Sequence, residues 1–121
     1  MIRLPQNRFC IENRASDLTQ NPYLTFSLLA ASVTEGIQKG LKPPAITNKS
    51  LYDLNDQEQQ EISTLPRNLL EAVDAFKKDP IIYEVFSDPL INNFVSYKYD
   101  EWRRYHTTTT DWEIREYLKL F

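Results

Sequence analysis

The chain has 121 residues, 41% hydrophobic and 26% charged, which suits one domain with a modest core and argues against a disordered segment. Its formal net charge of −3, with scattered basic residues, argues against a general nucleic-acid binder. A single cysteine, Cys10, cannot form an internal disulfide, and no apolar run is long enough for a membrane span, so we expect a cytoplasmic protein.

The first expected element is a short extended run at residues 9 to 14. Its alternation places Glu12 and Arg14 on one face and Ile11 and Asn13 on the other. A lone strand has no partner for its backbone groups. The first dozen residues are therefore expected either to join a sheet supplied from elsewhere or to stay irregular, which suggests an incomplete domain.

A helix is expected next, with Asn21 as its cap, Pro22 at its first position and Gly40 at its end. Apolar residues follow at helical spacing: Phe26, Leu29, Ala30, Val33 and Ile37. The other side carries Leu24, Leu28 and Ala31, so both sides are apolar or small. This pattern predicts a core helix between two layers.

Residues 41 to 64 read as a long connection, with Pro43-Pro44, Asn48, Ser50 and a polar run from Asn55 to Glu61. A second helix is expected over Leu69–Lys78, because Asn68 can cap it and Glu71 lies three residues on.

Three further helical segments follow. A short one covers residues 80 to 86, and a long one opens at Asp88-Pro89 and runs to Tyr105. The threonines at 107 to 110 interrupt it, and Thr110 with Glu113 forms a capping box for a last amphipathic helix ending near Phe121. The fold class is therefore mainly α, with one or two short N-terminal β segments and no second domain.

Several motifs occur in order along the chain: "MIRLP", "IENR", "NPYL", "GIQKGLKPP", "LYDL" and "LPRNLLEAVDAFKKD". Together they resemble the C-terminal end of the catalytic domain of the glutamine synthetase family, over residues 1 to 121. The tail "EWRRYHTTTTDWEIREYLKLF" resembles the branch of glutamate-amine ligases and type III enzymes. The resemblance covers the final quarter or so of a full member. It implies that an N-terminal β-grasp domain and most of the catalytic sheet are absent from this chain.

The resemblance implies an ATP-dependent ligase of glutamine biosynthesis and nitrogen metabolism. Such enzymes join glutamate to ammonia or an amine through a γ-glutamyl phosphate, with Mg²⁺ or Mn²⁺ as cofactor and ATP as co-substrate. It also implies a homo-oligomer, with no nucleic-acid or membrane partner. Ammonia and a small organic amine both remain open as the nucleophile.

The same resemblance implies roles for four residues. Glu12 matches a ligand of the divalent metal, and Arg14 matches the residue that binds the carboxylate of glutamate. Arg3 matches a residue near the ATP phosphates, and Arg3 and Arg14 are the catalytic candidates. Glutamate and arginine suit these roles. Carboxylate oxygen is a hard ligand for a divalent metal, and a guanidinium group can bind a carboxylate or phosphate through two hydrogen bonds. With two glycines in the chain, glycine-rich phosphate loops are excluded, so any contact with ATP is through side chains.

One position departs from the family pattern. Many members have a further basic residue two positions before the motif glutamate, where this chain has Cys10. Arg8 could take over its contact with ATP phosphates only if the loop bulges, and both outcomes remain open. Cys10 itself is expected to be a small buried residue, and His106 a C-terminal cap of its helix.

Three functions follow from these patterns. The favoured one is the C-terminal portion of the ligase, inactive alone because it lacks the other metal carboxylates. The first alternative is a non-catalytic remnant or helical interaction module that associates with full-length relatives. The second sets the resemblance aside and takes a small helical interaction domain.

Overall fold

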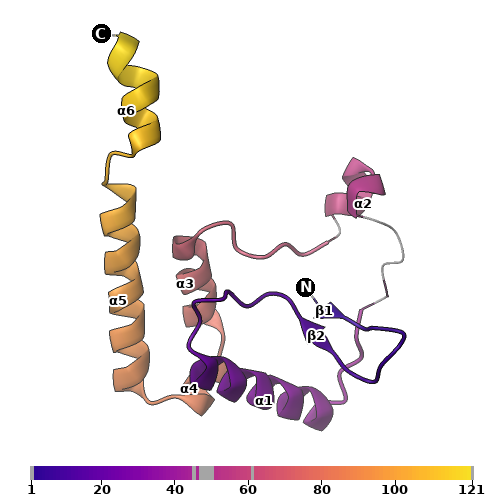
Figure 1. Cartoon of the computed structure of the whole chain (residues 1–121). Helices are drawn as coiled ribbons and strands as arrows, with labels where there is room; N and C mark the ends of the chain where they lie inside the picture. Colours follow the sequence, from indigo (N-terminus) through magenta and orange to yellow (C-terminus); the bar gives the residue numbers. More distant parts are fainter. Residues whose placement is uncertain (1, 45, 47–50, 61, 121) are drawn as a thin grey trace. The chain divides into compact units, whose positions relative to one another are not determined.

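The computed structural model describes residues 2–44, 46, 51–60 and 62–120, with only the backbone of Leu51 (Figure 1). The chain divides into two compact units, residues 1–66 and 67–121, which are described separately. Asn48, Ser50 and Glu61 of the predicted connection and Phe121 of the last helix lie outside the described residues. No helix in the described part is both long and apolar enough to cross a membrane.

The first unit begins with two short strands that pair with each other. Strand β1 (Ile2–Arg3) lies antiparallel to β2 (Glu12–Asn13), with Arg3 opposite Glu12. Within the expected run at residues 9 to 14, only Glu12 and Asn13 pair as a strand. The expectation that the first dozen residues lack a partner within the chain was wrong, because the intervening loop returns β2 to β1.

Helix α1 (Pro22–Gln38) begins and ends where the sequence predicts. The Asn21 side chain accepts hydrogen bonds from the backbone N–H groups of Tyr23 (3.0 Å) and Leu24 (3.4 Å). Gly40 follows the helix with a φ of 58°, which lies in the left-handed region that glycine adopts without strain.

Three hydroxyl groups of α1 bond to the helix itself. Each donates to the backbone carbonyl four residues earlier at 2.8 Å: Ser27 to Tyr23, Ser32 to Leu28, and Thr34 to Ala30. These three hydroxyls are thus satisfied within the helix, whereas that of Thr25 donates to the side chain of Gln20 at 2.6 Å.

The predicted burial of α1 was wrong for this chain. No residue of the helix is buried, and Phe26 and Ile37 are 67% and 76% exposed. Burial needs a covering layer, and the rest of the first unit offers only two-residue strands and short helical turns as cover.

A short helix within the predicted connection was missed. A 3-10 turn (Leu51–Asp53) precedes α2 (Asp56–Gln60). The Asn55 side chain accepts from the backbone N–H of Glu58 at 2.9 Å, and the Glu58 carboxylate accepts from the backbone N–H of Asn55 at 3.1 Å. This reciprocal capping pair was the signal in the sequence, and it was overlooked because the polar run lacks apolar periodicity.

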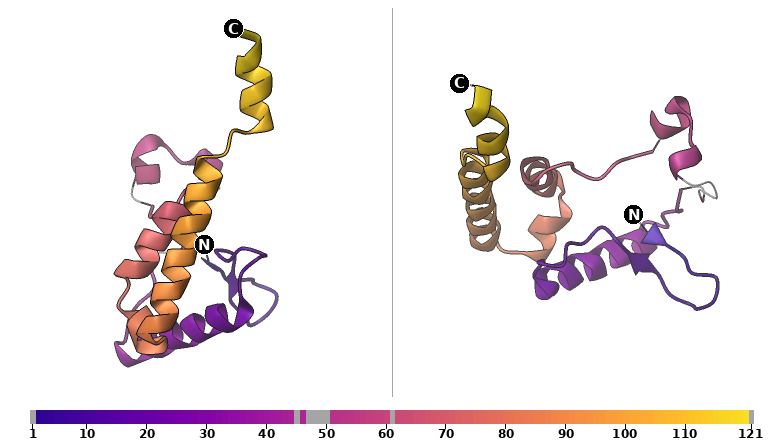
Figure 2. Two further views of the ribbon diagram at one scale, coloured as in Figure 1. Left: turned by 90° about the vertical axis from the view of Figure 1, so that its left-hand side faces the viewer. Right: turned by 45° about the horizontal axis from the view of Figure 1, so that its top comes forward.

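The second unit contains the predicted helices: α3 (Leu69–Lys78), α4 (Ile81–Val85), α5 (Asp88–His106) and α6 (Asp111–Tyr117), followed by a 3-10 turn at Leu118–Leu120. Helices α3 and α5 lie side by side in opposite directions (Figures 1 and 2). Their contact includes the rings of Phe76 and Phe94, 5.3 Å apart. The buried core of the second unit consists of residues from α3, α4 and α5: Val73, Ile81, Ile82, Ile91 and Val95.

A polar contact also joins α3 to α5. The Tyr99 hydroxyl donates to the Asp74 carboxylate at 2.5 Å, and the Lys77 ammonium lies 5.3 Å from the centre of the Tyr99 ring. The hydrogen bond to Asp74 raises the pKa of Tyr99 above its ordinary value of 10.0, because the phenol proton is held between two oxygens.

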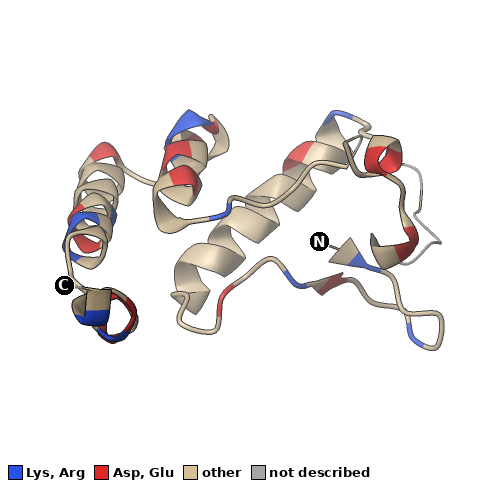
Figure 3. Ribbon diagram, turned by 90° about the horizontal axis from the view of Figure 1, so that it is seen from above, with Lys and Arg blue, Asp and Glu red and all other residues tan. Residues whose placement is uncertain are grey.

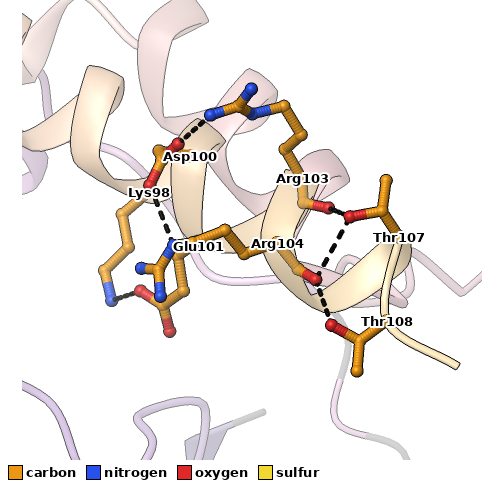
Figure 4. A network of polar contacts seen from close by, with 7 residues as sticks. All are labelled: Lys98, Asp100, Glu101, Arg103, Arg104, Thr107 and Thr108. Atoms are coloured by element: carbon orange, nitrogen blue, oxygen red, sulfur yellow. Dashed lines mark hydrogen bonds and ion pairs between the residues drawn. The ribbon is translucent and has the colours of Figure 1, made fainter. Parts of the chain in front are cut away.

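The end of α5 explains why the helix stops at the threonines (Figure 4). Asp100 accepts from Arg103 at 2.5 Å and from Arg104 at 2.9 Å within the last turns. The hydroxyls of Thr107 and Thr108 donate to the carbonyls of Arg103 (2.8 Å) and Arg104 (2.6 Å). The backbone N–H of Thr107 still donates to the Arg103 carbonyl, but that of Thr108 donates to Tyr105, so the Thr108 hydroxyl satisfies the Arg104 carbonyl in place of the next helical bond.

Helix α6 then restarts with the predicted capping box. The Thr110 hydroxyl accepts from the backbone N–H of Glu113 at 3.2 Å, and the Glu113 carboxylate accepts from the backbone N–H of Thr110 at 2.7 Å. Two short-range bonds thus define where the last helix begins.

Ile82 has an exposed fraction of only 2%, so its truncation tests the core of the second unit. We expect Ile82→Ala to lower the free energy of unfolding by about 2–5 kcal/mol, because the lost methyl groups leave a cavity. Urea unfolding monitored by circular dichroism measures this change in the free energy of unfolding. Ile37→Ala, at a residue 76% exposed, is the control and should change stability by less than about 0.5 kcal/mol.

The contact of Tyr99 with Asp74 predicts a loss of stability at high pH. Because the folded chain holds the phenol proton more tightly than the unfolded chain, the stabilisation is complete below pH 10 and is lost as the pH rises through the higher folded pKa. The difference in unfolding free energy between wild type and Tyr99→Phe should therefore shrink above pH 10. The chain has seven tyrosines, so the Tyr99 pKa is read from the difference between the phenolate absorbance titrations of wild type and Tyr99→Phe, and a value at or below 10 would contradict the prediction.

Candidate functional site

The residues with predicted roles lie together on the β1–β2 segment. Arg3 is on β1, directly opposite Glu12 on β2, and Arg14 follows β2. Acidic and basic positions are interspersed along this segment (Figure 3). Because paired residues project from the same face of an antiparallel sheet, this register brings Arg3 and Glu12 within reach of one another.

A tight turn brings a fourth residue to the same place. The backbone N–H of Cys10 donates to the carbonyl of Arg8 at 3.1 Å, which closes a three-residue turn at Phe9. The turn shortens the path from Arg8 to Glu12, and the Arg8 guanidinium contacts the Glu12 carboxylate at 2.5 Å. The loop therefore bends in the way that a contribution of Arg8 to this site requires.

The Glu12 carboxylate accepts hydrogen bonds from three guanidinium groups. Its Oε2 atom lies 3.0 Å from Nη2 of Arg14 and 3.2 Å from Nη1 of Arg3, and its Oε1 atom faces Arg8. The Glu12 side chain is 19% exposed, whereas those of the three arginines are 52–63% exposed. The carboxylate is thus the centre of the cluster and the arginines form its outer face.

These contacts hold the pKa of Glu12 at about 2, well below its ordinary value of 4.5. The hydrogen bonds from Arg8 and then Arg14 are the main causes, and Arg3 adds a smaller one. Glu12 is therefore ionised at any pH near neutrality, and a proton does not compete with a cation for its oxygens.

Short turns carry the chain from the cluster to α1. The Asn13 side chain accepts from the backbone N–H of Ala15 at 3.0 Å, and that of Asp17 accepts from Thr19 at 2.7 Å. Asn21 then caps α1. Such side-chain turns end the strand without a glycine and connect the cluster to the helix through few residues.

Glu12 could give one ligand to a divalent cation. Among the described residues, no three or more His, Cys, Asp or Glu side chains are grouped so that they could hold a metal ion. A hard cation needs about six oxygen ligands. The donor set here fits a contribution of one carboxylate to a site completed by other groups.

Two other candidate residues lie outside the cluster of contacts. Cys10 is exposed, so its predicted burial was wrong: the turn at Phe9 puts it on the surface of the loop. His106 lies in the last turn of α5, but the C-cap residue is Thr107 and not His106 as predicted, and the His106 ring stacks on Trp102 with 5.3 Å between centres.

The second unit has a surface cavity of about 620 Å³ beside the start of α3 and the end of α5. It is lined by Arg67, Asn68, Leu69, Glu101, Trp102, Arg104, Tyr105 and Thr108. Glu101 pairs with Lys98 and Arg104 with Asp100, so two of its charged groups are already neutralised. No residue with a predicted role lies in this cavity.

Comparison with known proteins places the chain in a family. Residues 1–117 match the family model described as "Glutamine synthetase, catalytic domain". The glutamine synthetases of Clostridium saccharobutylicum and Thermus thermophilus are each 34% identical over 126 aligned residues, which cover 100% of this chain and 28% of those proteins. That of Methanococcus voltae is 30% identical over 99% of this chain and 28% of its own length.

The chain therefore spans little more than a quarter (28%) of the length of these relatives. The match runs through the β1–β2 segment and all the described helices up to α6. With a family model matched over residues 1–117, the chain belongs to the glutamine synthetase family.

Proposed function

We propose that this chain contributes Glu12, Arg3, Arg8 and Arg14 to the active site of an ATP-dependent ligase that joins glutamate to ammonia or a small amine. The observation that carries the proposal is the cluster itself, in which one ionised carboxylate lies within 2.5 to 3.2 Å of three guanidinium groups. A ligase that brings a polyphosphate and a carboxylate together needs such positive groups, because the two substrates repel each other.

In the proposed reaction an oxygen of the glutamate side-chain carboxylate attacks the γ-phosphorus of ATP, and ADP leaves. The lone pair of ammonia or an amine then attacks the acyl carbon of the γ-glutamyl phosphate, phosphate departs, and the nitrogen loses a proton. Arg14 would clamp a carboxylate of glutamate, and Arg3 and Arg8 would hold phosphate oxygens. Guanidinium groups suit both tasks, since their paired N–H groups match the oxygens of carboxylate and phosphate.

The ligase would need Mg²⁺ or Mn²⁺, and Glu12 would supply one of the oxygen ligands. A bound divalent ion supplies positive charge that draws phosphate and carboxylate oxygens together. Glu12 suits this role because its carboxylate is ionised at neutral pH and is partly exposed. The remaining ligands would come from strands of the catalytic domain outside this chain, and the family resemblance implies an N-terminal β-grasp domain in addition.

A second candidate function is association with full-length relatives without catalysis. The exposed apolar side chains of α1 favour it, because Phe26 and Ile37 are available to another protein surface. Co-purification with an intact synthetase, unchanged by Glu12→Gln, would distinguish it from the ligase. The homo-oligomeric state, the cytoplasmic location and the glutamate-amine ligase branch stay predictions of the sequence.

The purified 121-residue chain should have no ligase activity. The physical reason is that a single carboxylate cannot hold the divalent ion in a reactive geometry. The measurement is release of phosphate that depends on ATP, glutamate and Mg²⁺ together, against a no-protein control. Release above that control that disappears in Glu12→Gln would contradict the prediction.

A chimera tests the role of Glu12 directly. The glutamine synthetase of Clostridium saccharobutylicum would carry this chain in place of its matching segment, and its ligase activity would be measured with and without Glu12→Gln. We expect the substitution to lower kcat about 10²–10³-fold, the scale reported for loss of one electrostatic group at a reacting centre.

Glu116→Gln is the matched control for the chimera. It removes the same charge from an exposed position on α6, away from the three arginines in the chain. The activity of this variant should stay within about twofold of that of the parent chimera, since substitutions at exposed positions outside cores, caps and charged networks have small effects. An active chimera that tolerates Glu12→Gln would rule out the proposed role.

A further inference from the structure

The surface cavity of the second unit, beside the start of α3 and the end of α5, has a lining in which several polar groups are already bonded. Glu101 and Arg104 each form an ion pair within α5, at 2.7 and 2.9 Å (Figure 4). The Asn68 side chain accepts from the backbone N–H of Glu71 at 2.9 Å, and the Thr108 hydroxyl donates to the Arg104 carbonyl at 2.6 Å. These groups would have to give up a bond before they could bind a ligand.

Three other hydrogen-bond donors of the lining are not used by the chain. Among the described residues, none accepts from the Arg67 guanidinium, the Trp102 indole N–H or the Tyr105 hydroxyl. Arg67 is exposed, and within that part of the chain its side chain forms no ion pair. A ligand that carries negative charge and accepts hydrogen bonds would therefore find donors already in place.

The charge of the lining favours a ligand with one negative charge. Because the ion pairs of Glu101 and Arg104 are each neutral, the single positive charge of Arg67 is left. A guanidinium group binds a carboxylate through two parallel hydrogen bonds, so one carboxylate would neutralise it. A phosphate dianion would bring a second negative charge into a cavity that also contains the Glu101 carboxylate, which disfavours it.

Aromatic rings form much of the apolar part of the lining. The rings of Trp102 and Tyr105 have centres 6.4 Å apart and are tilted by 39°. The His106 ring stacks on Trp102 with 9° between the planes, which restricts the orientation of the indole. Such rings bind other flat aromatic groups by stacking or by edge contacts. The volume of about 620 Å³ lies within the range of small-molecule sites, roughly 300–1,000 Å³.

We propose that this cavity binds a small, flat aromatic molecule with one carboxylate, its carboxylate on Arg67 and its ring against Trp102 and Tyr105. The inference goes beyond the proposed ligase, because no residue proposed for that reaction lines the cavity. Its ligand also differs from the ligase substrates: glutamate has no aromatic ring, and ATP carries several negative charges.

The test uses the ¹⁵N-labelled 121-residue chain and 2-naphthoate as the probe. The chain has two tryptophans, so its NMR spectrum has two indole N–H signals, which Trp112→Phe assigns. We expect 2-naphthoate to shift the Trp102 signal with a dissociation constant of about 1 mM or lower, the strength usual for a ligand of this size. The signal of Trp112, on α6 outside the cavity, should not move. An unmoved Trp102 signal, or equal shifts of both signals, would overturn the inference.

Two related compounds separate the parts of the recognition. 2-Naphthamide keeps the ring without the charge and should bind at least about tenfold more weakly, on the scale of one charge-assisted hydrogen bond. Decahydro-2-naphthoate keeps the charge without a flat ring and should bind about threefold or more weakly, on the scale of one aromatic pair. Binding of either compound as tight as that of 2-naphthoate would contradict the proposed ligand class.

Arg67→Gln tests the residue that selects the anion. It should weaken 2-naphthoate binding at least about tenfold, because it removes the uncompensated positive charge. Arg115→Gln is the matched control, since it removes the same charge from an exposed position on α6 outside the lining, and it should stay within about twofold of wild type. Equal effects of the two substitutions would count against the site. Either result leaves the ligase proposal untouched, because the β1–β2 segment is unchanged in both variants.

Discussion

The geometry of the candidate site depends on the charge of one carboxylate. Arg3, Arg8 and Arg14 repel each other, and they lie close together because Glu12 accepts from all of them. The short strands around the arginines add little apolar packing, since Ile2 and Ile11 are 69% and 67% exposed. Exposed ion pairs are individually weak, so it is the convergence of three on one group that defines the position of the side chains.

Apart from the short α2, the helices could be predicted closely from the sequence, because their ends depend on local bonds. Asn21, Asn68 and Thr110 each cap a helix by accepting from a backbone N–H two or three residues on, and the residue types alone signal this. Burial depends on distant neighbours instead. The sequence therefore predicted the ends of α1 correctly but its burial wrongly, and it did not foresee the partner of β2.

The candidate site was only partly accessible to sequence reasoning. Alternation along a strand placed Glu12 and Arg14 on one side, and their side chains do meet. The approach of Arg8 depends on a turn at Phe9. That turn contains neither glycine nor proline, so the residue types do not predict it. The roles proposed for these residues come from the family resemblance, and the structure adds that their charged groups meet at Glu12.

The hydroxyls of α1 bear on where this helix can reside. Ser27, Ser32 and Thr34 each donate to their own helix, so none of them depends on water for a partner. A polar group transferred from water without such a bond carries a penalty of a few kcal/mol, roughly 1–3 for a hydroxyl in proteins. If another protein surface covered α1, these three hydroxyls would therefore need no new hydrogen-bond partner.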